Sequence, residues 1–181
     1  MKLTIDNHVK FQLPRNWSVL SDNGVTTLNS IIESAVFNAK DLKFQANLRN
    51  DNGETITTVQ TYKWNSEFTQ DNVSAMTKTD LNGYDKDMHR QMKKEIAQVG
   101  GSFSDWLGTK TQRINGLTIL SSKYRRVSKH QPQDHFIVQV LRIYSGSESF
   151  SFVISYHEES TLPLSILVEK IISTLGCKTC S

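Results

Sequence analysis

Residues 134–176 contain a strand, a turn, a second strand and a helix, and this unit limits the fold more than any other part of the chain. Residues 136–144 are mostly apolar, and the Ser145-Gly-Ser-Glu148 segment that follows is typical of a hairpin turn. In residues 149–157 large apolar side chains alternate with smaller or more polar ones, which predicts a strand with one aromatic face.

The helix predicted after this hairpin has recognisable ends. Thr161 is a candidate N-cap, Pro163 fits the first turn, and Gly176 fits the position just past the end. Between them, apolar residues recur every three or four positions and form one stripe: Leu164, Leu167, Val168, Ile171 and Leu175. A helix with such a stripe must pack on a sheet, and the aromatic face just before it is the nearest candidate.

The first third of the chain contains further strand patterns. Alternating residues predict strands at 8–13, 43–49 and 54–64, and Asp51-Asn-Gly53 predicts a hairpin between the last two. Asp22-Asn-Gly24 is another turn signal, and residues 25–37 fit either short strands or a helical turn.

The middle of the chain changes to a helical period. Apolar residues between Val73 and Ile96 form a helical stripe, in which Gly83 is placed to bend or split the helix at a cost of about 1 kcal/mol relative to alanine. Strands at 102–114 and 117–129 follow, joined by Asn115-Gly116. The whole pattern predicts an α+β fold with an antiparallel sheet of about six to seven strands packed by two main helices, because the short connections forbid a parallel sheet.

Composition bounds the domain count and the location. Without a repeat or a linker, residues 1–176 are expected to form a single α+β domain, followed by a short cysteine-containing tail at 177–181. No apolar run approaches the roughly 20 residues of a membrane-spanning helix, and the first six residues hold no apolar signal region. This favours the cytoplasm, unless a leader has been removed. A net charge of +3 is too mild to indicate a nucleic-acid binder.

Residues 107–133, here called the basic arm, carry six positive side chains and no acidic one. One interpretation is a binding patch for an acidic protein surface, a lipid head group or a phosphate. The other is an edge hairpin kept soluble and unpaired by its lysines and arginines. The candidate partner-binding residues are Lys110, Arg113, Lys123, Tyr124, Arg125, Arg126 and Lys129.

Signals for chemistry are weak. Cys177 and Cys180 form a C-x-x-C after a helix C-terminus, where the helix dipole has the wrong sign to stabilise a thiolate, and zinc would need four ligands. Free thiols or one disulfide are expected instead. His135 and His157, with Glu158, are the nearest approach to a catalytic group, across the hairpin. No cofactor or metal site is predicted.

The chain resembles the Mog/PsbP/DcrB-like group of α/β/α sandwich domains over nearly its whole length. The matching segments are Phe11-Gln-Leu-Pro-Arg-Asn-Trp17, the Ala46-Asn-Leu48 strand, the long helix near 70–98, Ile114-Asn-Gly116 leading into a strand, and the hairpin before the last helix. Residues 25–37 and the cysteine tail do not match. The resemblance implies accessory factors rather than enzymes: a binder of a small GTPase, assembly subunits, envelope lipoproteins and chaperones.

Three functions follow as hypotheses. The first is a non-enzymatic protein-binding accessory, adaptor or chaperone-like factor, whose partner presents an acidic surface; an exposed edge strand would also permit a homodimer. The alternative is an envelope protein, periplasmic or of the lipoprotein type, whose leader is missing. The third is an enzyme with a site near His135 and His157.

Overall fold

The computed structural model describes all residues except 36–40, 99–101, 128–133, 146–147, 161–162 and 178–181. The strands in the described part are β1 (Lys2–Ile5), β2 (Val9–Gln12), β3 (Ser18–Val19), β4 (Asp41–Arg49), β5 (Thr55–Trp64), β6 (Ser102–Ile114), β7 (Leu117–Val127), β8 (His135–Ile143), β9 (Ser149–His157) and β10 (Gly176–Cys177). The helices are α1 (Asp22–Ala35), α2 (Gln70–Ser74), α3 (Lys78–Gln98) and α4 (Leu164–Ser173). None of these helices is long and apolar enough to cross a membrane.

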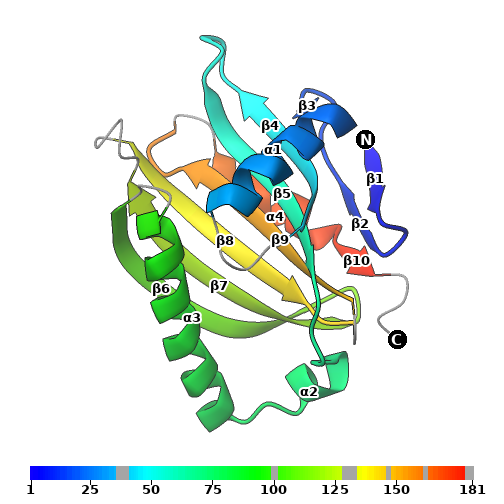
Figure 1. Ribbon diagram of the computed structural model, residues 1–181, viewed down its shortest axis with the longest axis vertical. Helices are drawn as coiled ribbons and strands as arrows, with labels where there is room; N and C mark the ends of the chain where they lie inside the picture. Colours follow the sequence, from blue (N-terminus) through cyan, green and yellow to red (C-terminus); the bar gives the residue numbers. More distant parts are fainter. Residues whose placement is uncertain (36–40, 99–101, 128–133, 146–147, 161–162, 178–181) are drawn as a thin grey trace.

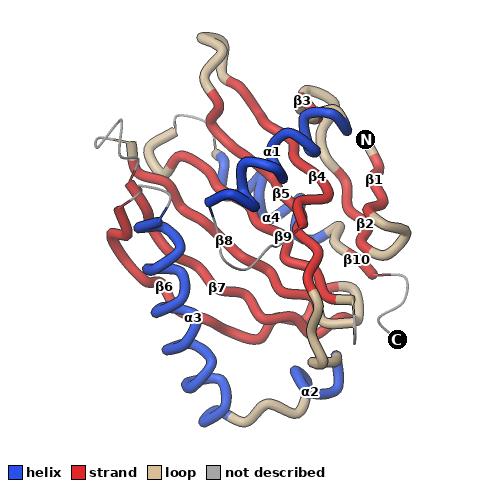
Figure 2. The backbone as a smooth tube through the Cα atoms, viewed as in Figure 1, coloured by secondary structure: helices blue, strands red, loops and turns tan. Residues whose placement is uncertain are grey.

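A seven-stranded sheet forms the centre of the molecule, in the order β3-β4-β5-β9-β8-β7-β6, and every neighbouring pair is antiparallel (Figure 2). The predicted α+β class and strand count are therefore confirmed. Hairpins account for most of the neighbours, whereas β5 and β9 come together from distant parts of the sequence.

The two faces of this sheet are covered by different elements (Figure 1). On one face, called the α4 face, α4 and the small sheet enclose the main core, which includes Phe150, Phe152 and Ile154 of β9. On the other, called the α3 face, Met88 and Met92 of α3 pack against β7 and β8. The last helix thus packs on the aromatic face of the preceding strand, as its stripe predicts.

Residues 22–35 form a helix, which decides between the alternatives for residues 25–35 and corrects the turn predicted at Asp22-Asn-Gly24, while residues 36–37 lie outside the described residues. The Ser21 hydroxyl accepts a hydrogen bond from the Gly24 backbone N–H at 3.3 Å, and the Val25 N–H bonds to the Ser21 carbonyl at 2.9 Å. These bonds start helix α1 where three turn-forming residues suggested a reversal.

The long predicted helix is two helices, and the break is not at Gly83, which lies inside α3. Thr69 caps α2 in a capping box with Asn72. Thr77 caps α3 in the same way, because its hydroxyl accepts from the Asp80 N–H at 3.2 Å while the Asp80 carboxylate accepts from the Thr77 N–H at 2.9 Å. Two caps eight residues apart in sequence set two helix starts where the apolar stripe suggests one.

A second, three-stranded sheet, in the order β1-β2-β10, joins the start of the chain to residues 176–177 and was not predicted. Gly176 therefore begins a strand, while α4 ends at Ser173 and is followed by Thr174 as its C-cap. Glu148 ties this sheet to the large one through His8 at 2.9 Å and Lys63 at 2.7 Å. The hydrogen bond from Lys63 holds the pKa of Glu148 below its usual value.

Candidate functional site

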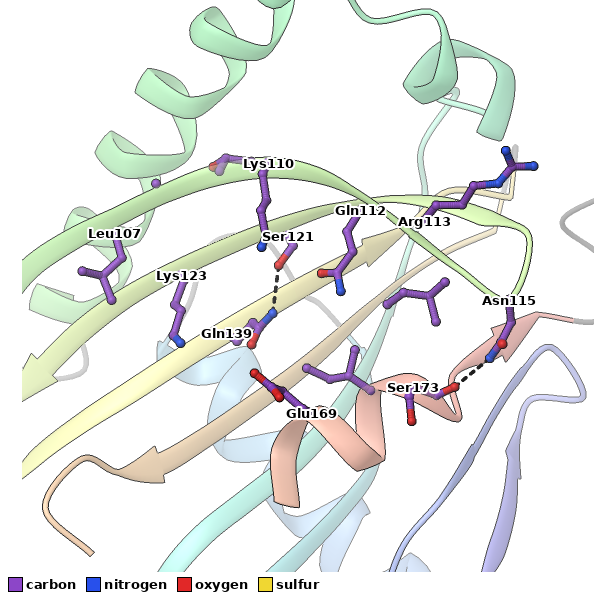
Figure 3. A pocket seen from close by; sticks show the side chains of 14 residues that line it. Leu107, Lys110, Gln112, Arg113, Asn115, Ser121, Lys123, Gln139, Glu169 and Ser173 are labelled. Carbon is purple, nitrogen blue, oxygen red and sulfur yellow. Dashed lines mark hydrogen bonds between the residues drawn. The ribbon is translucent and has the colours of Figure 1, made fainter. Parts of the chain in front are cut away.

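An open hollow of about 610 Å³ lies on the α4 face, where α4 leaves β6, β7 and β8 uncovered (Figure 3). Strand β6 supplies one wall, α4 supplies the other through Glu169, Ile172 and Ser173, and the floor comes from Ser121 and Lys123 of β7 with Gln139 of β8. The hollow therefore includes part of the basic arm.

Strand alternation and one bulge shape this hollow. Lys110 pairs with Ser121 across the β6–β7 ladder, and Gly108 pairs with Lys123. The register shifts between Trp106 and Gly108, where Gly108 adopts a φ of 93° that favours glycine. Because Gly108 has no side chain, β6 places no side chain directly across from Lys123, whose other cross-strand partner is Gln139 of β8. The Lys123 amine therefore faces the hollow.

Lys110 and Lys123 are the charged side chains of β6 and β7 that point into the hollow, whereas Arg113 of the lining points away from it (Figure 3). Neither lysine forms an ion pair within the described part of the chain, and Lys123 lies over the Tyr156 ring at 6.0 Å from its centre. Glu169, an exposed residue of α4, is the one acidic side chain of the lining. The hollow thus has an excess of positive charge.

Neutral polar groups complete the lining. Gln139 donates a hydrogen bond from Nε2 to the Ser121 hydroxyl at 2.9 Å. The Oε1 of Gln112 is buried and has no hydrogen-bond partner among the described residues. At one end, Asn115 donates from Nδ2 to the backbone carbonyls of Ser173 at 2.9 Å and Leu175 at 2.8 Å, which fixes α4 against the β6–β7 hairpin (Figure 3).

The structure does not bring the rest of the basic arm to this site. Arg113 lines the hollow, but its guanidinium points away from it (Figure 3). Tyr124 and Arg126 lie on the α3 face, where Tyr124 is buried beneath α3 and Arg126 lies 4.8 Å from the Phe136 ring centre. Burial raises the pKa of Tyr124 to about 12.

Arg125 is already engaged by two carboxylates. It bonds to Asp105 at 2.8 Å and to Glu158 at 2.8 Å. Lys129 lies outside the described residues. Of the candidate partner-binding residues, Lys110 and Lys123 are therefore the two whose side chains meet at a common site.

The histidine pair of the third hypothesis is not brought together. Phe136 pairs with His157, so His135, one position earlier on β8, faces the opposite side of the sheet. His157 packs on Phe136 at 4.2 Å between ring centres, and Glu158 is held by Arg125. Among the described residues, no group of three or more histidine, cysteine or acidic side chains could hold a metal.

The cysteine tail is only partly described. Cys177 is disulfide-bonded, which agrees with the predicted alternative of one disulfide. Cys180 lies outside the described residues, as does Thr161, the predicted N-cap.

Sequence reasoning missed four residues of the lining, the neutral polar Gln112, Ser121 and Gln139 and the acidic Glu169. The sequence held one signal for this site: Gln139 is a polar residue that alternates with Ile137 and Leu141 on the apolar face of a strand. The role of Glu169 had no such signal, since an exposed acidic residue on a surface helix is ordinary. The arrangement suits binding better than bond-making, because lysine amines and amide groups attract and orient an acidic group.

The fold has solved counterparts. No protein-family model matches the chain, and no curated protein matches its sequence. The solution structure of cyanobacterial PsbP (CyanoP) from Synechocystis sp. PCC 6803 aligns with a TM-score of 0.60 at 16% identity, over 98% of this chain and 91% of that one. LpqN, described as involved in cell envelope biogenesis of Mycobacterium tuberculosis, aligns with a TM-score of 0.50 at 9% identity, over 93% and 82% of the two chains. The fold expected from the PsbP-like resemblance is confirmed.

Proposed function

We propose that this chain is a non-enzymatic accessory module that binds an acidic segment of a partner protein in the hollow between β6, β7 and α4. The observation that carries the proposal is the pair formed by Lys110 and Lys123, whose side chains face the hollow without a carboxylate partner among the described residues. The PsbP-like fold supports an accessory role by analogy.

The surroundings of the lysines favour a carboxylate-bearing peptide over a smooth charged surface. The hollow is concave, and its amide and hydroxyl groups can hydrogen-bond a peptide backbone while the lysines attract its acidic side chains. Such charge pairing gives partner choice and association rate more than raw affinity.

The double substitution Lys110→Glu/Lys123→Glu is expected to weaken binding of a fluorescent hexaglutamate peptide by about tenfold or more, because it replaces two attractions with two repulsions. Fluorescence anisotropy at low salt measures the dissociation constant. Arg125 and Arg126 are poorer targets, since one is paired with carboxylates and the other stacks on the opposite face.

The matched control is Lys93→Glu/Lys94→Glu on the exposed side of α3, which makes the same change in net charge away from the hollow. Retained affinity in this control, with loss in the first variant, supports the proposal. Equal losses in both variants would show a general charge effect, and absence of peptide binding by the wild type would contradict the proposal that the hollow binds an acidic segment. Capture from a lysate with the same three proteins then names the partner.

A second candidate, an envelope protein of the same fold, is favoured by the disulfide-bonded state of Cys177. Disulfides persist in oxidising compartments and are rare in the cytosol. Protein recovered from its native compartment under thiol-blocking conditions is expected to contain no free thiol. Two free thiols in that sample would contradict the envelope assignment and leave the accessory role in place.

A further inference from the structure

A buried arginine on the α3 face lacks a counter-charge among the described residues. Arg142 of β8 is only 8% exposed, and its Nε and Nη2 have no hydrogen-bond partner among the described residues. No carboxylate in the described part of the chain forms an ion pair with it. Removing a cation from water costs several kcal/mol unless it is paired and hydrogen-bonded, so Arg142 lacks a compensation that buried charges usually have.

The known neighbours of Arg142 compensate only in part. The guanidinium lies 5.2 Å from the centre of the Trp64 ring on β5. Tyr84 of α3 is a hydrogen-bond partner of Arg142, and the charge of Arg142 and this hydrogen bond oppose the rise that burial causes in the pKa of Tyr84. The Tyr84 hydroxyl lies 3.3 Å from that of Tyr144. These aromatic groups provide a favourable ring face and weak dipoles, but no negative charge.

Three more unpartnered polar atoms lie on this same face. Ser151 stands directly across the β8–β9 ladder from Arg142, and Ser149 stands directly across the β5–β9 ladder from Trp64. The two serine hydroxyls and the Trp64 Nε1 are buried without a partner among the described residues. Because paired residues have Cβ atoms about 4.5–5.5 Å apart, these groups surround one small region of three adjacent strands.

All of these groups can donate a hydrogen bond, and they include a full positive charge. Other buried side-chain atoms also lack partners among the described residues, for example those of Trp17, Thr57 and Thr61. None of them belongs to a charged group. The region around Arg142 is therefore distinct in both charge and hydrogen-bonding capacity.

The geometry of the Nε–Nη2 edge of the Arg142 guanidinium determines which ligand fits. Nε–H and Nη2–H lie along one edge of a guanidinium and point in parallel, which matches the two oxygens of a planar oxyanion such as a carboxylate. Ser149 and Ser151 are at most 1% exposed, so the site suits a small free ion and not a side chain of a docking protein. The aromatic groups beside it reach the surface through Phe68, which is 42% exposed and lies against Tyr144.

We propose that Arg142 binds a small planar oxyanion of the carboxylate class through Nε and Nη2, with the hydroxyls of Ser149 and Ser151 as additional donors. The site lies on the opposite face of the sheet from the hollow, on the layer covered by α3 (Figure 1), and does not depend on the accessory role.

Sodium formate is the probe, exchanged for sodium chloride at constant ionic strength. Wild-type protein is expected to show a saturable rise in Tm with formate. Arg142→Lys, which keeps the charge but lacks the parallel pair of N–H groups, is expected to lose about tenfold or more of the apparent formate affinity. Ser151→Ala removes one donor and is expected to weaken formate binding by a smaller factor. Arg126→Lys, on the same face but stacked on Phe136, is the matched control and should respond as the wild type does.

A readout on the wild type alone keeps the test valid if the variants fail to fold. In the ¹⁵N spectrum, the Nε–H resonance of Arg142 should shift along a saturation curve as formate is added, and a nitrate-soaked crystal should show the ion at the Nε–Nη2 edge. No saturable shift at this resonance, only water at that edge, or equal formate responses in wild type and Arg142→Lys would overturn the proposal.

Discussion

Replacing Phe152 with alanine is expected to lower the free energy of unfolding by about 3–5 kcal/mol, the range for deleting a large aromatic side chain from a packed core. Phe152 is 0% exposed at the middle of β9, with Thr61 opposite it on β5 and Leu141 opposite it on β8. Its ring packs edge-on against the ring of Phe11 on β2, with 4.7 Å between the ring centres. The substitution therefore also removes a contact between the large sheet and the small sheet. Urea unfolding followed by circular dichroism measures the change.

Ile166→Ala is the control for this experiment. Ile166 is apolar and lies on α4, but it is 54% exposed, so its loss should change stability by less than about 0.5 kcal/mol. Near-equal effects of the two substitutions would mean that the α4 face does not form the main core.

The second large effect is expected at Asn115, the residue that ties the β6–β7 hairpin to the end of α4. Its Nδ2 donates two hydrogen bonds to backbone carbonyls, and its own backbone has a φ of 47°. Asn115→Gly keeps the left-handed backbone but removes both bonds, at an expected cost of about 2 kcal/mol. Asn115→Ala adds the strain of a Cβ in that conformation, about 1 kcal/mol more.

The order of the three proteins is the informative result, with wild type most stable, Asn115→Gly next and Asn115→Ala least. Asn52→Ala, at the exposed tip of the β4–β5 hairpin, serves as the control and should leave the unfolding midpoint unchanged. Equal stability of wild type and Asn115→Gly would show that the hydrogen bonds to α4 contribute nothing.

Local patterns predicted much of this fold. Alternation and Asn-Gly or Asp-Asn-Gly turns gave β4 with β5 and β6 with β7, because a hairpin is specified by adjacent residues. Two helix starts differ from the prediction because a side-chain cap decides them, Ser21 for α1 and Thr77 for α3.

Pairing between strands that are distant in the chain could not be predicted from local sequence patterns. Strand β10 is two residues long and pairs with β2 across most of the chain, so no local period marks it. The hollow has the same origin, since Lys110 and Glu169 become neighbours only after α4 has packed on the sheet. The buried state of Arg142 was likewise hidden, because one arginine in an apolar strand does not reveal what covers it.

The position of β9 between β5 and β8 sets when this sheet can form during synthesis. Strands β4 and β5 leave the ribosome as a hairpin with one open edge, and that edge pairs only after residues 149–157 have emerged. The nascent chain therefore carries an unsatisfied sheet edge for about half of its translation. Agents that shield strand edges, such as a ribosome-associated chaperone, would act during that interval and become dispensable once β9 has inserted.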